Sequence, residues 1–188
     1  MKRIFTPEEY LAMEEHAPYK SEFFQGEIFA MSGGSANHST IISNCIISLG
    51  NTLKGKPCRV FESNMRLLVK RNGLYTYPDA TVVGGQVEFA MGRNDTITNP
   101  TLIVEVLSPT PHAYDRIKIF ALYKALESLH EYLLVNSEQV HATLLRLSNN
   151  QWVIEMYDEL DAVFRLESIA SDVALRDLYD KIEFENKT

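Results

Sequence analysis

The chain has 188 residues, 45% of them hydrophobic, and a formal net charge of −7 at pH 7. This length suits one domain, residues 1–188, with a sizeable core. The acidic balance argues against a large basic nucleic-acid surface, because phosphate neutralisation dominates such binding. It still allows a small basic groove, or a metal site that brings its own positive charge.

The sequence predicts neither a membrane span nor a secretory signal. No run of about eighteen apolar residues is present, and the basic start lacks an apolar segment after it. Cys45 and Cys58 have neither CxxC spacing nor a His cluster nearby, which argues against a zinc site and a disulfide framework. Cys45 falls on an apolar helical stripe and is expected in the core. These features together indicate the reducing cytoplasm.

The first elements follow from capping and spacing. TPEE at positions 6–9 has the pattern of an N-cap, an N1 proline and an acidic first turn, which predicts a short helix over 7–16. The glycine in residues 23–31 (FFQGEIFAM) fits a strand or a tight hairpin. Residues 31–40 (MSGGSANHST) indicate a loop.

From Ser39 onward, apolar residues recur at spacings of three and four, which predicts a helix. The stripe consists of Ile41, Ile42, Cys45, Ile46, Leu49 and Leu53. Gly50 is expected to interrupt this helix and Gly55 to end it.

Strands are predicted next. Residues 59–70 alternate between the two sides, as one strand would. Asn72-Gly73 is a strong hairpin signal, so residues 74–83 are the expected return strand. Residues 86–99 form a polar connection.

The nearly continuous apolar run at 102–107 is typical of the centre of a covered sheet. A helix is predicted over 111–127 with Thr110 as its N-cap, and another apolar strand over 132–135.

The last third predicts a hairpin of strands 140–147 and 152–157, followed by short irregular elements over 160–188. The alternation of strands and helices indicates one α/β domain, a mixed β-sheet with a helix on each face.

Glu105 interrupts the apolar run at 102–107. Burying an unpaired charge costs several kcal/mol, so this carboxylate needs compensation. It lies near the C-terminal end of its strand, where ligands gather in open α/β sheets. An ion pair with Arg66 on another strand explains it equally well.

Two further residues could join Glu105. Pro78 removes a ladder donor, which suggests an edge or a bulge that re-aims Asp79, although taken alone an ordinary Pro-Asp turn is favoured. Lys118 lies about two turns into its helix and leans toward the N-terminus, so it can reach back toward Glu105. Taken alone, an ion pair with Asp115 is favoured.

Two carboxylates and a lysine at one place suit a divalent cation and a scissile phosphate. Mg²⁺ takes one or two carboxylates and keeps its waters. The metal polarises a phosphoryl oxygen and lowers the pKa of an attacking water. A nearby ammonium orients that water or neutralises developing charge.

These residues belong to a longer ordered set. It comprises Pro78-Asp79, then Glu105-Val106-Leu107-Ser108-Pro109, then Tyr114-Asp115-Arg116 with Lys118 and Tyr123. In this set the sequence resembles the Uma-type family of restriction endonuclease-like proteins, within the PD-(D/E)XK nuclease superfamily. The upstream block of Ser21-Glu22, Gly26-Glu27, Met31 and His38 resembles it too. The resemblance extends from about residue 6 to about residue 178.

The resemblance implies a restriction-endonuclease-like core, an α/β (α+β) fold whose mixed sheet has helices on both faces. It implies Asp79 and Glu105 as the metal-binding acids, with Glu105 leading the (D/E)XK element. Leu107 occupies the place of the superfamily's lysine, and the family's lysine on the following helix matches Lys118. Glu22 matches an upstream acid and is either a further ligand, or a support for the ligands, or an exposed glutamate at a strand edge or helix end.

Three nearby features are predicted to be structural. His38 could contact phosphate, but a structural cap is favoured. The Gly33-Gly34-Ser35 segment fits a flexible loop better than an anion site. Tyr123 is expected to pack on the sheet rather than stack on bases.

We therefore expect a Mg²⁺-dependent DNA endonuclease, with Mn²⁺ as a substitute, in which Asp79, Glu105, Lys118 and Glu22 are catalytic. The family implies one active site per subunit, so a homodimer is the expected way to cut a duplex. One alternative is a nucleic-acid-binding module with little turnover, which the displaced lysine favours. Another is a structural or interaction protein, in which the acids serve only as ion-pair partners.

Overall fold

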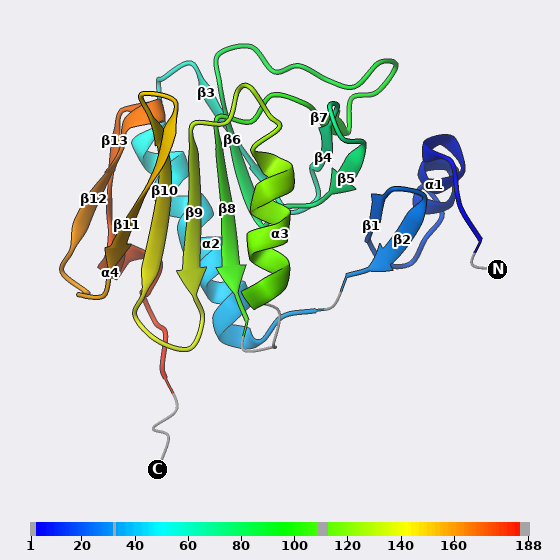
Figure 1. Cartoon of the computed structure of the whole chain (residues 1–188). Coiled ribbons are helices and arrows are strands. Elements are labelled where there is room, and N and C mark those ends of the chain that lie inside the picture. Colours follow the sequence, from blue (N-terminus) through cyan, green and yellow to red (C-terminus); the bar gives the residue numbers. More distant parts are fainter. Residues whose placement is uncertain (1–2, 32, 109–112, 185–188) are drawn as a thin grey trace.

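The computed structural model, shown in Figure 1, describes residues 3–31, 33–108 and 113–184, and the backbone alone for 113–117. The helices are α1 (Pro7–Glu14), α2 (Ala36–Thr52), α3 (Ala113–Tyr123) and α4 (Leu175–Leu178), with a 3-10 turn η1 (Glu167–Ile169). One sheet contains, in order across it, β11 (Gln151–Tyr157), β10 (Ala142–Ser148), β9 (Glu131–Asn136), β8 (Leu102–Leu107), β6 (Ala80–Gly84) and β3 (Cys58–Glu62). A second contains β2 (Glu27–Ala30), β1 (Ser21–Phe24), β5 (Leu74–Thr76), β4 (Arg66–Val69) and β7 (Thr96–Ile97). A small third sheet pairs β12 (Val163–Leu166) with β13 (Ser171–Ala174).

The first of these, called here the main sheet, is mixed. β6 pairs antiparallel with both β3 and β8, whereas β8 and β9 run parallel. A parallel pair needs a crossover connection, and α3 provides it. β10 and β11 complete the sheet as an antiparallel hairpin. The predicted strands at 102–107 and 132–135 and the predicted final hairpin are thereby confirmed.

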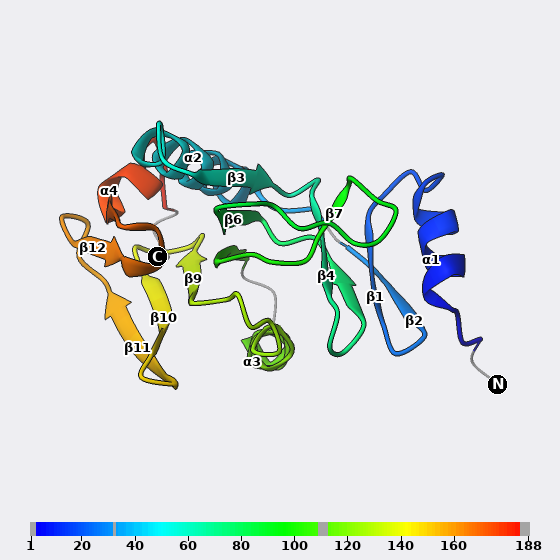
Figure 2. The same cartoon turned by 90° about the horizontal axis from the view of Figure 1, so that it is seen from above.

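Helices cover both faces of the main sheet, as Figure 2 shows for α2 and α3. One apolar cluster joins Cys45 and Leu49 of α2 to Val104 of β8. The other joins Tyr123 of α3 to Ile103 of β8. Alternate residues of β8 therefore face opposite helices. The predicted mixed sheet with a helix on each face is confirmed, and so is Cys45 as a buried core residue.

The start of α2 corrects the predicted loop at 31–40. The helix begins at Ala36 rather than near Ser39, because the Ser35 hydroxyl accepts a hydrogen bond from the backbone N–H of His38. It also continues through Gly50 to Thr52. Packing of the buried stripe outweighs the roughly 1 kcal/mol that an interior glycine costs, so the predicted interruption is wrong.

The two long strands predicted at 59–70 and 74–83 are each divided between two sheets. A turn, in which Met65 N–H donates to the carbonyl of Glu62, separates β3 from β4. Residues 77–79 separate β5 from β6 in the same way. The predicted Asn72-Gly73 turn is confirmed and joins β4 to β5, with Gly73 at φ 75°. The polar connection at 86–99 also contributes β7.

The five-stranded sheet is called the second sheet below. The predicted N-terminal hairpin forms two of its strands, and the predicted N-terminal helix packs on it. Thr6 and Glu9 form a capping box on α1, which ends at Glu14 rather than at residue 16. The hairpin of β1 and β2 turns at Gln25-Gly26, both at positive φ. Tyr10 of α1 stacks on Phe23, with ring centroids 5.1 Å apart. One face of the second sheet is thus covered by α1, and the other is left for α3.

The chain after β11 is more regular than the predicted irregular tail. β12, β13 and α4 pack against the α2 side of the main sheet, with Phe164 and Leu178 in the same cluster as Cys45. α3 ends at Tyr123 instead of residue 127, and the predicted N-cap Thr110 lies outside the described residues. Within the described ranges, no helix is long and apolar enough to cross a membrane.

Candidate active site

Asp79 directly precedes β6, and Glu105 lies on β8, the neighbouring strand of the main sheet. Ala80 and Val104 are the last residues paired in register at this end of β6 and β8, and Asp79 and Glu105 directly adjoin that pair in the chain. Asp79 Oδ2 accepts a hydrogen bond of 2.7 Å from the backbone N–H of Val106. The carboxylate of Asp79 therefore extends the pairing of β6 and β8 beyond the last paired residues.

Glu105 is half-buried on the α3 side of β8. The hydroxyl of Tyr123 donates to Glu105 Oε1 over 3.0 Å. Burial, followed by the charge of Glu105, raises the pKa of Tyr123 well above its ordinary value. The tyrosine hydroxyl therefore keeps its proton and orients the carboxylate of Glu105. Tyr123 packs on the sheet as predicted, and its hydroxyl in addition contacts a site residue.

The alternative ion pair between Arg66 and Glu105 is wrong. Arg66 lies on β4 in the second sheet, where it donates to the hydroxyl of Tyr77 at 2.8 Å and to that of Thr96 at 3.3 Å. Its guanidinium also lies 3.7 Å from a carboxylate oxygen of Asp95. Arg66 thus stabilises the second sheet.

Glu22 reaches the same region from the second sheet. β1 and β5 pair at Phe23 and Tyr75, which brings Glu22 next to Thr76, whose hydroxyl donates to Glu22 Oε1. Burial raises the pKa of Glu22, and the bond from Thr76 opposes that rise. The charges of Glu105 and Glu22 both raise the pKa of Tyr123. Both acids therefore lie close to its hydroxyl, and Glu22 is not an exposed strand-edge glutamate.

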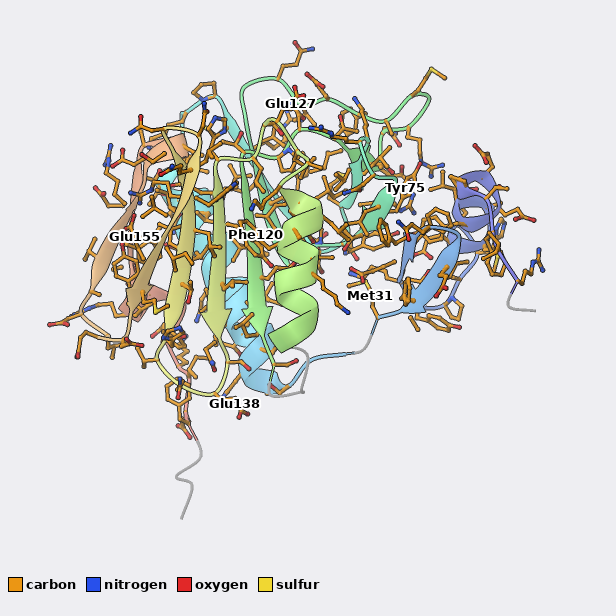
Figure 3. All side chains as sticks on the ribbon, viewed as in Figure 1. Met31, Tyr75, Phe120, Glu127, Glu138 and Glu155 are labelled. Carbon is orange, nitrogen blue, oxygen red and sulfur yellow. The ribbon has the colours of Figure 1, made fainter. Side chains whose placement is uncertain are left out.

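Lys118 and Glu22 line one hollow of about 570 Å³ between α3 and the second sheet. Lys118 is exposed. The opposite flank of α3 packs on the main sheet: Figure 3 shows Phe120 on the side of α3 toward β9, where its ring stacks on Tyr132 at 5.3 Å. The lysine is thus on the flank of α3 that faces the second sheet. The side chain of its predicted alternative partner, Asp115, lies outside the described residues.

His38 differs from its prediction as a cap. Its backbone is capped by Ser35, but its ring Nε2 lies 3.8 Å from Asp79 Oδ2, with both side chains only 17% exposed. A Cβ on Gly34 would come within 2.2 Å of His38 Nδ1. Gly34 is therefore required for close approach to the histidine ring. Gly33, Gly34 and Ser35 themselves lie outside any helix or strand, as predicted.

Asp79 and Glu105 offer the hard oxygen donors that Mg²⁺ and Mn²⁺ prefer. Mg²⁺ is usually bound through one or two carboxylates and keeps several waters, so two adjacent carboxylates fit it. Zinc sites take three or four protein ligands. In the ranges that the structure describes, no group of three or more His, Cys, Asp or Glu residues could hold a metal.

Sequence analysis missed Thr76, which holds Glu22 by its hydroxyl. Its contact follows from a register between β1 and β5, residues far apart in the chain. A threonine in a short strand carries no local sign of such a contact.

Comparisons with known proteins agree with this fold. A family model described as "Uma2: Putative restriction endonuclease" matches residues 7–176. The chain is 37% identical over 182 residues to the uncharacterized protein slr1290 of Synechocystis sp. (strain ATCC 27184 / PCC 6803 / Kazusa), covering 95% of this chain and 93% of that one. It is 38% identical over 134 residues to the uncharacterized protein sll1609 of the same organism. That match covers 71% of this chain and 76% of sll1609.

A solved structure from Anabaena variabilis ATCC 29413, titled a putative nuclease belonging to DUF820, has a similar fold. Its TM-score is 0.71 at 22% sequence identity, and the match covers 92% of this chain and 96% of that chain. Its fold therefore agrees with the restriction-endonuclease-like core expected from the sequence.

Proposed function

Since the chain belongs to the Uma2 family of restriction endonuclease-like proteins, we propose that it is a Mg²⁺-dependent endonuclease that hydrolyses phosphodiester bonds of DNA. The observation that supports this most is that Asp79 and Glu105 adjoin the last pair of β6 and β8, with Asp79 Oδ2 accepting from the backbone N–H of Val106, the residue after Glu105. Two carboxylates at the same end of neighbouring strands offer oxygen ligands for one hydrated cation. The proposal extends the family's nuclease character to a metal and a substrate.

Each nearby residue has a task in this proposal. Asp79 and Glu105 bind the cation through their carboxylate oxygens. Tyr123 holds Glu105 in place by its hydroxyl, and His38 packs beside Asp79. When bound, the cation supplies a polarised phosphoryl oxygen and a more acidic water.

Lys118 and Glu22 line the hollow between α3 and the second sheet. An ammonium at Lys118 attracts the scissile phosphate and stabilises charge that develops on it. Glu22 lies close to the hydroxyl that holds Glu105, so it supports the site's acids or accepts a proton from the water. A homodimer would bring two such sites to the two strands of a duplex.

A plasmid-nicking assay with the purified full chain tests the proposal. Wild type should nick supercoiled DNA with Mg²⁺ or Mn²⁺, and Glu105→Gln should not. Glu155→Gln provides the matched control, because Glu155 is also a strand glutamate and is 31% exposed on β11. Cleavage of RNA alone would overturn the assignment to DNA. Metal binding without cleavage of any nucleic acid would favour the binding-module alternative, in which Leu107 stands where the superfamily has its lysine.

A further inference from the structure

The hollow beside Lys118, called here the α3 hollow, is walled by one face of the second sheet. Glu22 and Phe29 are directly paired between β1 and β2, so their side chains share a face. Phe24, two residues after Glu22, lies on that face as well. Phe24 and Phe29 thus share this face of the second sheet with the half-buried Glu22.

The other wall is the outer flank of α3. Lys118, Ile119, Ala121 and Leu122 contribute to it, and Leu74 of β5 lies between the two walls. Asn72 donates to the carbonyl of Leu122 at 3.0 Å, which ties the β4–β5 turn to the end of the helix. Apart from Glu22 and Lys118, the described lining is apolar. The hollow is therefore an apolar chamber with an acid and an ammonium on its walls.

Its dimensions and exposure suit a flat ring. A volume of about 570 Å³ falls within the roughly 300–1,000 Å³ typical of ligand pockets. Phe29 is 46% exposed although it is a large aromatic side chain. Its ring is therefore accessible to a partner entering the hollow.

We propose that the α3 hollow receives an unstacked nucleobase of single-stranded DNA, with Phe29 and Phe24 as its stacking surface and Lys118 at the neighbouring phosphate. This rests on the proposed nuclease function, since it concerns the substrate of the same site. Aromatic stacking tolerates every base because each base has a π-face. The charge of Lys118 is complementary to the phosphate that follows such a base.

The charge of the whole chain favours the same substrate. At a net charge of −7, phosphate neutralisation supplies little of the affinity for a rigid duplex. An unpaired base can stack on the protein's aromatic rings, whereas the bases of a duplex are already stacked on one another. The enzyme should therefore prefer single strands, flaps or gaps to intact duplex.

Binding of the full chain to two labelled strands tests this, in Ca²⁺ instead of Mg²⁺ to limit cleavage. One strand is a short oligothymidylate, and the other has the same sugar–phosphate backbone without bases. Wild type should prefer the strand with bases. Phe29→Ala should weaken binding to that strand by about 5- to 150-fold, the equivalent of the roughly 1–3 kcal/mol of one stacked base, and leave the baseless strand unaffected. Phe29→Trp should retain binding.

Ile47→Ala is the matched control, since Ile47 is an apolar residue 60% exposed on α2 and absent from the lining of the hollow. It should bind both strands as wild type does. Equal binding of the two strands by wild type, or wild-type behaviour of Phe29→Ala, would overturn the base pocket. If Mg²⁺-dependent nicking persists in either case, only the pocket fails. If the chain neither binds nor cuts DNA, both the base pocket and the proposed nuclease function fail.

Discussion

Glu131 on β9 and Glu105 on β8 are both carboxylates in central strands of the main sheet, but their surroundings differ. Glu131 is 0% exposed and accepts hydrogen bonds from the Arg146 side chain, the backbone N–H groups of Glu167 and Ser168, and the Ser168 hydroxyl. These donors belong to β10 and to the η1 turn. Glu131 therefore serves the fold, by fixing η1 to the sheet.

Glu105 lies three steps further along the same strand pair, since Leu102 pairs with Glu131 and Glu105 pairs with Leu134. It is half-buried and accepts a hydrogen bond from the hydroxyl of Tyr123, and the residue after it donates its backbone N–H to Asp79. Its printed contact comes from a side-chain hydroxyl, whereas Glu131 is held by backbone N–H groups and an arginine. The comparison teaches that the role of a strand carboxylate depends on its neighbours and its accessibility, since both residues occur in apolar strands of the sequence.

The largest effect is expected at Lys118, which belongs to the candidate active site and not to the buried contacts of Glu131. Lys118→Ala should lower turnover by about 10²–10³-fold, as for removal of one group that stabilises charge in the transition state, while metal binding stays nearly intact. Lys118→Arg should rescue only in part, because a planar guanidinium differs from a compact ammonium in shape. Nicking rates of the three proteins at equal concentration measure this. Equal rates for wild type and Lys118→Ala would remove the lysine from the mechanism.

At the buried Glu131, substitution by alanine should lower the free energy of unfolding by about 3–5 kcal/mol. The reason is that Arg146 and two backbone N–H groups lose a buried partner. Glu155 pairs with the same arginine at 3.0 Å but is 31% exposed. Glu155→Ala should therefore cost at most about 1 kcal/mol. Urea denaturation of both variants separates them, and similar losses would contradict the structural role assigned to Glu131.

An intermediate effect is expected at Tyr123, which orients Glu105. Tyr123→Phe keeps the ring in the core and removes only the hydroxyl. Residues that orient metal ligands typically change metal affinity or activity by about 10–100-fold. Mn²⁺ calorimetry should show such a loss in Tyr123→Phe. An unchanged affinity would mean that the tyrosine only packs.

The smallest effect concerns the pH dependence of stability at Glu22. Its pKa is raised above the ordinary 4.5 by burial, so the folded state holds this proton more tightly than the unfolded state. Its stabilising contribution is complete below about pH 4.5 and is lost as pH rises through the raised pKa. In metal-free urea denaturation, wild type should lose stability relative to Glu22→Gln across that range. Parallel pH profiles would show that Glu22 is not desolvated.

Local patterns in the sequence predicted much of the fold because they report on local structure. The hairpin at Asn72-Gly73 and the central strand at 102–107 are examples. Residues 59–70 show the limit: their alternation continues across Ser63-Asn64, where the chain leaves one sheet for another. Which strands share a sheet is set by contacts between distant segments, and no local pattern records them.

The candidate site divides in the same way. Asp79, Glu105, Lys118 and Glu22 were predicted from residue types and from the family resemblance, and their catalytic roles stay predictions. The bond from Thr76 to Glu22 depends on the register of β1 and β5, and the approach of His38 to Asp79 depends on how α2 packs on the main sheet. Such contacts require the three-dimensional structure.

Calorimetric titration of Mn²⁺ into wild type, Asp79→Asn and Glu105→Gln tests the central claim most directly. Both substitutions conserve volume and remove one charge, and Glu155→Gln controls for the loss of charge elsewhere on the main sheet. Wild type and Glu155→Gln should bind the ion with the same affinity, and the two site variants should each bind it far more weakly. Unchanged affinity in both Asp79→Asn and Glu105→Gln would contradict the assignment of these two carboxylates as the metal site.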